Sequence, residues 1–232
     1  MSKKRVTTHQ IKHDEFISTV SRIVLYLEER RKQVFLAVGL LVVLVFGIIG
    51  ARTFLKMRSE QASYLLGSAL QLYHQANSDS ATGIADPDKL NKALEALGEV
   101  PDLYPFSRAA RIARFYSGLC LLDLGRDEEA YTSLEAFLDR HPRAFNASQA
   151  RLVLANLAGD RGDVEEARTW FLEAVGVDSP GLPKEEVLLE MGRFLEAVGR
   201  NEEAFEVYDR IIQEFPDSDF RYLAQQRFDA LS

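Results

Sequence analysis

The sequence predicts an all-α protein in which one N-terminal transmembrane helix is followed by a solenoid of helical hairpins and a C-terminal capping helix. Two observations lead to this prediction. Small residues, glycines and prolines recur at a spacing of 37 residues, and periods of 20–50 residues are typical of stacked-repeat folds. An uncharged apolar stretch, residues 34–51, separates a basic N-terminal head from an acidic C-terminal region.

The 37-residue spacing is kept at three kinds of position. The residues that keep it are Ala93, Ala130, Ala167 and Ala204, then Gly125, Gly162 and Gly199, and the prolines Pro105, Pro142 and Pro216, with Ser179-Pro180 at the one position of the proline series that lacks a proline. Each glycine is expected to end the first helix of a hairpin, because glycine adopts the left-handed C′ conformation without steric cost. The acidic residues that follow each glycine suit the positive end of a second helix.

Three complete hairpins and one degenerate hairpin follow from this pattern. The complete hairpins pair residues 106–124 with 127–140, 147–159 with 164–175, and 183–198 with 201–214. The degenerate one pairs 58–76, a helix continuing from the membrane, with 89–97, and residues 220–231 form the capping helix that solenoids require. The predicted divisions are a head at 1–33, a transmembrane helix at 34–55, a membrane-proximal region at 56–105, three repeats at 106–217 and a cap at 218–232.

Small residues are expected where the two helices of a hairpin meet. They are Gly118, Ala155 and Gly192 midway along the first helices, and Ala130, Ala167 and Ala204 near the start of the second helices. Leu134, Phe171 and Tyr208 share one position of the repeat, one turn further along the second helix. We expect these three side chains to fill the seam between the helices.

The order of small residue, glycine turn, Glu-Glu-Ala, aromatic or leucine, and proline resembles the tetratricopeptide repeat over about residues 88–216. The usual repeat has 34 residues, and the unit here is three residues longer. Arg114, Arg151 and Leu188 stand where the family has an aromatic residue. The resemblance implies a protein without catalytic activity that binds peptides or helices in a concave groove lined by its first helices.

The candidate groove residues grade from apolar to charged along the chain. They are Ile112, Phe115, Leu119, Leu122, Gln149, Leu152, Asn156, Glu186, Leu189 and Arg193. Two interpretations stay open for Phe115 and Leu119, which either contact a partner or pack on the membrane-proximal helix. The Lys/Asn arrangement with which family members hold a C-terminal carboxylate is absent from the sequence, so that mode of binding is not expected.

Residues 34–51 are long enough to cross a membrane. They include 18 residues without a charge, or 22 if Arg52 snorkels and the helix runs to Leu55. At about 1.5 Å per residue, 18 residues cover roughly 27 Å, close to the ~30 Å hydrocarbon core. A signal peptide would have a shorter apolar core of about 7–15 residues, so we interpret the stretch as an uncleaved anchor.

Cations around this anchor predict its direction. Eight Lys/Arg precede it, and only Arg52, Lys56 and Arg58 follow it closely. The positive-inside bias then places the N-terminus in the cytoplasm. The predicted location is the bacterial inner membrane, with a single pass and a periplasmic C-terminal domain.

The basic head carries apolar residues at helical spacing, including Phe16, Val20 and Leu27. Such a helix is expected to lie on anionic lipid, and docking on another membrane protein is the alternative. His9 and His13 have metal-ligand spacing, but two histidines without a third ligand do not predict a metal site.

Charge and chemistry exclude several classes of function. Residues 52–232 hold twenty Lys/Arg against thirty-one Asp/Glu, and an acidic surface repels phosphate backbones, so nucleic acid is not an expected partner. Cys120, the single cysteine of the sequence, lies among leucines and is expected to be buried. The sequence shows no nucleophile elbow or phosphate-binding loop, so neither enzyme activity nor a cofactor is expected.

The layout of basic head, single anchor and acidic repeat region resembles the ancillary SecYEG translocon subunit family of bacterial inner membranes. This resemblance implies a non-enzymatic adaptor beside the protein-export channel, with translocon subunits, chaperones or exported polypeptides as partners. The alternative is a scaffold in outer-membrane or cell-envelope assembly or in cell division, because the ending at 215–219 followed by a helix is similar to such periplasmic repeat proteins. The sequence identifies neither the partner nor the oligomeric state.

Overall fold

A computed structural model describes residues 31–78, 85–176 and 182–232, and α-helix is the only regular secondary structure among them. The predicted all-α fold is confirmed. The chain divides into two compact units, residues 1–57 and 58–232. The head lies almost entirely outside the described residues, so its amphipathic helix stays a prediction, as does the expectation that His9 and His13 bind no metal.

Helix α2 (Arg31–Ser78) contributes its residues up to 57 to the first unit and its residues from 58 onward to the second. In the first unit its apolar side chains are open to solvent: Leu36 is 70% exposed, Val43 72% and Phe46 70%. No other described helix covers these side chains, and an all-apolar helix is found either in a protein core or in a membrane. Among the described residues, α2 is the one helix long and apolar enough to cross a membrane.

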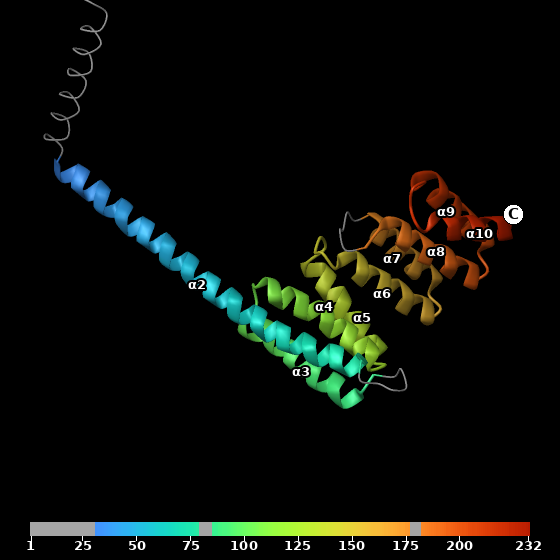
Figure 1. Ribbon diagram of the computed structural model, residues 1–232, viewed down its shortest axis with the longest axis horizontal. Coiled ribbons are helices and arrows are strands. Elements are labelled where there is room, and N and C mark those ends of the chain that lie inside the picture. Colours follow the sequence, from blue (N-terminus) through green and yellow to red (C-terminus); the bar gives the residue numbers. More distant parts are fainter. Residues whose placement is uncertain (1–30, 79–84, 177–181) are drawn as a thin grey trace, which may run out of the picture. The chain divides into compact units, whose positions relative to one another are not determined.

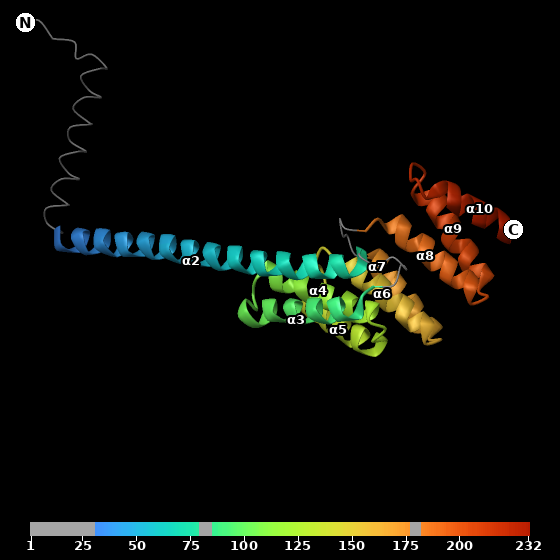
Figure 2. The same cartoon turned by 60° about the horizontal axis from the view of Figure 1, so that its bottom comes forward.

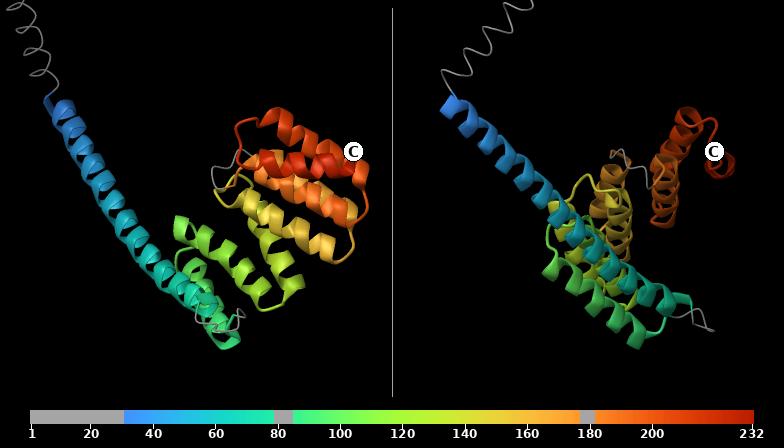
Figure 3. Two further views of the ribbon diagram at one scale, coloured as in Figure 1. Left: turned by 45° about the vertical axis from the view of Figure 1, so that its right-hand side comes forward. Right: turned by 60° about the vertical axis from the view of Figure 1, so that its left-hand side comes forward.

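The second unit stacks its helices in the order of the sequence (Figures 1 and 2). They are α3 (Pro87–Leu103), α4 (Arg108–Asp123), α5 (Asp127–Arg140), α6 (Ala147–Asp160), α7 (Val164–Gly176), α8 (Lys184–Ala197), α9 (Asn201–Glu214) and α10 (Arg221–Leu231). Helices α4 and α5, α6 and α7, and α8 and α9 form antiparallel hairpins, and α10 packs on α9 (Figure 3). The predicted bounds of α5 and α9 agree residue for residue, and those of α4, α6, α7, α8 and α10 agree within two residues.

Helix α3 is longer than the predicted 89–97. At its start, the Asp86 carboxylate accepts hydrogen bonds from the backbone N–H groups of residues 88 and 89, at 3.0 and 3.4 Å, and Pro87 suits the first helical position. At its end, Gly98 and Pro101 disfavour a helix. Leu97 and Val100 are nevertheless fully buried, and their packing holds this turn against the core.

The three turn glycines have the backbone conformation that the sequence predicts. Gly125, Gly162 and Gly199 have φ of 69°, 81° and 80°. The residue after each glycine donates its N–H to the carbonyl five positions back, as Arg126 does to Leu121 at 2.9 Å. This is the bonding of a Schellman motif, which satisfies carbonyls at the end of the first helix.

The seam between the helices of each hairpin is filled where small residues meet large ones. A methyl group added at Gly118 would lie 2.5 Å from Leu134 Cδ2, and one added at Gly192 would lie 2.5 Å from Tyr208 Cε1. Ala155 and Phe171 occupy the matching positions of the middle hairpin and are both fully buried. The helices therefore approach too closely for a larger side chain at these positions.

Arginine takes the place of the usual aromatic residue early in two of the first helices. Arg114 Nη1 lies 3.5 Å from the carbonyl oxygen of Pro105, and Arg151 Nη1 lies 3.3 Å from that of Pro142. The two bonds are one repeat period apart. Arg151 also pairs with Glu173 at 3.2 Å. These guanidinium groups therefore tie the turn before each first helix to the helix itself.

Candidate protein-binding surface

The candidate groove residues on α4 lie largely in the interior. Phe115 is only 1% exposed, and its ring centroid is 5.7 Å from that of Phe137. Leu119 is half-buried and packs against the core shared by α2, α3 and α4 and the core shared by α4, α5 and α6. Ile112 and Leu122 are half-buried as well. Phe115 therefore packs in the core and does not contact a partner, which decides between the two interpretations for this residue.

The candidate residues on α6 and α8 form the accessible part of the wall. Gln149 and Asn156 are exposed, with half-buried Leu152 between them on the same face of α6. At the matching positions of α8, Arg193 is exposed and Glu186 half-buried. Leu189 departs from the expectation: it is 2% exposed and lies in the core of α7, α8, α9 and α10, because its side chain packs into the hairpin instead of facing outward.

The second helices α5, α7 and α9 form another surface, which we call the second-helix face. The Tyr131 hydroxyl donates to Glu166 Oε1 at 2.6 Å and accepts from Trp170 Nε1 at 3.0 Å. Arg161 lies 4.1 Å from the centre of the Tyr131 ring and bonds Glu166 at 3.0 Å. Burial, followed by the Glu166 carboxylate, raises the pKa of Tyr131. These contacts join the α4–α5 hairpin to the α6–α7 hairpin.

Ion pairs continue the second-helix face into the next hairpin. Arg168 of α7 pairs with Glu203 of α9 at 3.1 Å. Arg200, just before α9, pairs with Glu203 at 3.1 Å and reaches back to Glu165 of α7. The acidic residues at the helix starts therefore serve two purposes, since they complement the helix dipole and accept arginines from the neighbouring hairpin.

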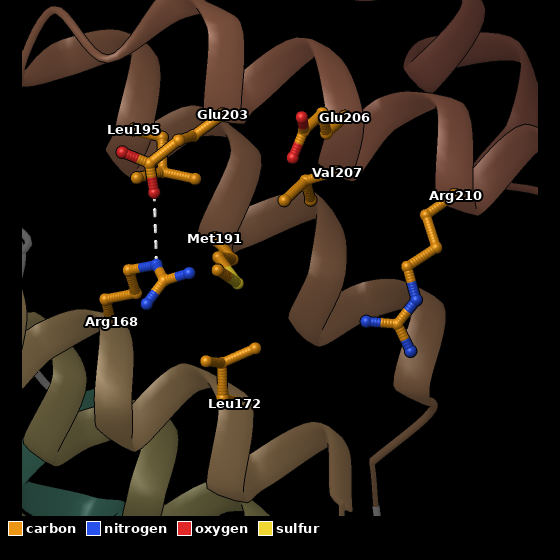
Figure 4. Close-up of a pocket in the computed structure, with 8 residues that line it drawn as sticks. All are labelled: Arg168, Leu172, Met191, Leu195, Glu203, Glu206, Val207 and Arg210. Carbon is orange, nitrogen blue, oxygen red and sulfur yellow. Dashed lines mark ion pairs between the residues drawn. The ribbon is translucent and has the colours of Figure 1, made fainter.

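A hollow of about 330 Å³ opens on this face between α7, α8 and α9 (Figure 4). Its lining residues are Arg168, Leu172, Met191, Leu195, Glu203, Glu206, Val207 and Arg210. Met191 and Leu195 form an apolar base, and the Arg168–Glu203 pair crosses one side. The hollow cannot be recognised from the sequence, because three helices contribute residues to it and no single helix carries the whole pattern.

The described residues contain no group of three or more His, Cys, Asp or Glu side chains that could hold a metal ion. Cys120 is buried and its Sγ lies 3.1 Å from the Leu90 carbonyl oxygen. Burial, and to a smaller extent Asp123, raises the pKa of Cys120 to about 11. The thiol is therefore protonated at neutral pH and packs as a small hydrophobic side chain.

Family comparisons agree with this architecture. A model described as Tetratricopeptide repeat matches residues 129–183 and 152–219, and a second model with the same description matches residues 113–144. No curated protein shows significant similarity to the chain.

Several solved structures share the fold. A tetratricopeptide repeat protein from Parabacteroides merdae has 16% identity and a TM-score of 0.54, over 74% of this chain and 60% of its own. BtubC (BKLC) from P. vanneervenii has 14% identity and a TM-score of 0.53, over 76% and 82%. The TPR-like repeats of a putative kinesin light chain from Podosopora anserina have 15% identity and a TM-score of 0.50, over 76% and 84%. At these identities the likeness shows the fold alone.

Stacked repeats of this kind present extended surfaces that bind other proteins. The family models and the solved structures both point to one repeat type, and the 37-residue spacing of glycines and small residues underlies it. Residues 113–219 of this chain therefore resemble the tetratricopeptide repeat in sequence, and the solved structures share its fold.

Proposed function

We propose that the protein is a non-enzymatic adaptor, anchored in a membrane by α2, whose repeat region binds other proteins through the exposed residues of α6 and α8. One observation carries the proposal: α2 presents unburied apolar side chains over its first unit and runs on as the first helix of a protein-binding repeat region. A repeat region anchored in this way would keep a bound partner close to the bilayer.

The accessible wall has the chemistry of an adaptable binding surface. Gln149, Leu152 and Asn156 lie three and four residues apart, so they share one face of α6. Glu186 and Arg193 repeat that placement on α8. Amide groups both donate and accept hydrogen bonds, so the α6 face suits the main chain of an extended segment. The half-buried leucine between them supplies a small apolar contact.

The finer proposal concerns where the adaptor works. The excess of Lys/Arg before the apolar stretch supports a cytoplasmic N-terminus and repeats in the periplasm of a bacterium. The layout supports a position near the Sec translocon, where the repeats would receive exported polypeptides or recruit chaperones. Lipid contacts of residues 34–55 and of the basic head belong to the same proposal.

Site-specific photo-crosslinking in intact cells tests the binding surface. Probes belong at Gln149 and Asn156, which are exposed, while Phe115 is unsuitable because it is core. A probe at Gln213, exposed on α9, is the matched control. We expect adducts with translocon subunits, chaperones or exported chains at 149 and 156 and none at 213.

Two other outcomes would change the proposal. Adducts with proteins of envelope assembly or division would favour the alternative scaffold role. Equal adducts at all three positions, or none at 149 and 156, would remove the α6–α8 wall as the binding surface.

A further inference from the structure

The turn between α3 and α4, residues 103–107, carries the most exposed aromatic side chain of the described residues. We call it the edge turn. Phe106 is 101% exposed and Leu103 is 55% exposed. Single exposed apolar residues are common on proteins, but here two large ones stand three residues apart on a short connection. The contacts and charges around Leu103 and Phe106 indicate which kind of partner they fit.

The edge turn is fastened to the first part of α2 in the second unit. Arg58 Nη2 donates to the Leu103 carbonyl oxygen at 3.0 Å, and its guanidinium lies 5.3 Å from the centre of the Tyr104 ring. The Tyr104 hydroxyl reaches Gln61 Oε1 at 3.2 Å. On the other side, Ser107 Oγ caps α4 by accepting from the backbone N–H of residue 110 at 2.9 Å. The exposed residues are therefore presented by a fixed turn.

Covalent connection keeps the edge turn near the end of the apolar span. Arg58 follows Leu55, the last residue of the proposed anchor, by three positions. Three residues span at most about 11 Å even when fully extended. Since Arg58 holds Leu103, the edge turn stays within reach of the bilayer surface whichever way the two units are oriented.

The charge around the edge turn differs from that of the repeat region as a whole. Arginines cluster on the helix ends that meet at this side of the α4–α5 hairpin: Arg108, Arg111, Arg114, Arg140 and Arg143. Asp102 and Asp139 are the acidic residues of the same segments, 101–114 and 139–143. None of the five arginines forms an ion pair with a described residue.

We propose that the edge turn docks on the surface of the membrane that holds the anchor, with Leu103 and Phe106 among the lipid headgroups and the arginine cluster against anionic phosphates. Apolar side chains flanked by Lys/Arg are the composition that binds membrane interfaces. Docking gives the repeat region a second attachment beside α2, which restricts how the repeats swing about the anchor. The inference rests on the proposed membrane anchor.

Depth-dependent fluorescence quenching tests the contact on the full-length protein in vesicles. A Phe106→Cys variant is labelled with an environment-sensitive dye, and vesicles contain phosphatidylcholine and phosphatidylglycerol with a quencher-bearing lipid. The matched control is Tyr222→Cys, because Tyr222 is an exposed residue of α10. The native thiol at 120 is buried and protonated, so unmodified protein provides the blank. We expect quenching at 106 and none at 222.

The anchor is measured in the same sample by vesicle flotation after alkaline extraction. Flotation without quenching at 106 overturns the docking and leaves the anchor intact. Loss of flotation overturns the anchor and the docking together. Equal quenching at 106 and 222 also overturns the proposal, because the repeats would then lie on lipid without using the edge turn.

The arginines have their own test. Replacing Arg108 and Arg111 by glutamine is expected to reduce the docked fraction by about fivefold for each cation removed, in vesicles that contain phosphatidylglycerol. In pure phosphatidylcholine the same variants are expected to match the unmodified protein. Equal quenching of the double variant and its parent in anionic vesicles would overturn the role of the cluster.

Discussion

Arginines on two sides of the repeat region have opposite environments. On the second-helix face, Arg161, Arg168 and Arg200 each pair with glutamates at helix starts, within one hairpin and across to the next. Beside the edge turn, five arginines have no ion-pair partner among the described residues. The same residue type therefore forms ion pairs between repeats on one side and none with a described residue on the other.

The difference indicates that arginines on the second-helix face contribute to stability, whereas arginines beside the edge turn contribute to binding. On the second-helix face, Arg161, Arg168 and Arg200 are paired with glutamates, and these ion pairs hold hairpins together. Charges beside the edge turn contribute repulsion instead, and a fold keeps such a cluster at a cost to its own stability. The comparison predicts that substitutions on the first side change unfolding, while those on the second side change binding.

Removing the Trp170 side chain from the second-helix face should have the largest effect on stability. Trp170→Ala loses packing against two core clusters and the bond to Tyr131, and we expect a destabilisation of about 3 kcal/mol. Phe106→Ala should change stability by less than about 0.5 kcal/mol, because its side chain touches solvent. Urea unfolding followed by far-ultraviolet circular dichroism measures both. Equal losses would contradict the comparison.

Weakening one hydrogen-bond acceptor on the second-helix face should have a smaller effect on stability. Glu166→Gln weakens the bonds from Tyr131 and Arg161, and we expect a loss of about 1–2 kcal/mol. Asp102→Asn is the matched change beside the edge turn and should stay within about 0.5 kcal/mol. Denaturant midpoints compare the two variants with the parent, and a larger loss in D102N would reverse the assignment of the sides.

Removing an unpaired arginine should leave stability unchanged or raise it slightly. Arg140→Gln relieves repulsion from neighbouring arginines, and an exposed site of this kind contributes less than about 0.5 kcal/mol. The thermal midpoint at low salt is the sensitive measurement, because salt screens the repulsion. A clear loss of stability in R140Q would mean that this arginine has a partner.

The smallest effect concerns His141, which lies beside the arginine cluster. Burial, together with Arg111, Arg114 and Arg140, lowers the pKa of His141. A histidine whose folded pKa is depressed binds its proton less readily than in the unfolded chain, so stability falls as the pH drops below about 6.5. Arg140→Gln should raise the His141 pKa in a nuclear magnetic resonance titration. An unchanged pKa would separate this histidine from the cluster.

Several elements of the fold were predictable because they depend on local geometry. The bounds of α5 and α9 follow from a turn glycine before the helix and a proline just beyond it. The left-handed glycines at 125, 162 and 199 follow from the absence of a side chain. The close approach at Gly118 and Gly192 was visible as small residues facing large ones at a fixed period.

The candidate surface was predicted less well. Phe115 and Leu189 sit on the correct helices but in the core. A first helix carries one apolar stripe toward its own partner and another toward the adjacent hairpin, and the two stripes merge in the sequence. Only the packed neighbours decide which leucine or phenylalanine is covered, and the same reason hid the hollow lined by α7, α8 and α9.

The sequence alone determined the class of this protein, because a 37-residue period of glycine, alanine and proline specifies helix ends and close helix contacts, and both are local properties of the chain. The tertiary structure decided which charged side chains form ion pairs and which do not. Ion pairs such as Arg168 with Glu203 join residues 35 positions apart, and the contact of Arg58 with Leu103 joins residues 45 apart. Such distances close only when the hairpins stack, so their consequences for binding could be read only from the fold.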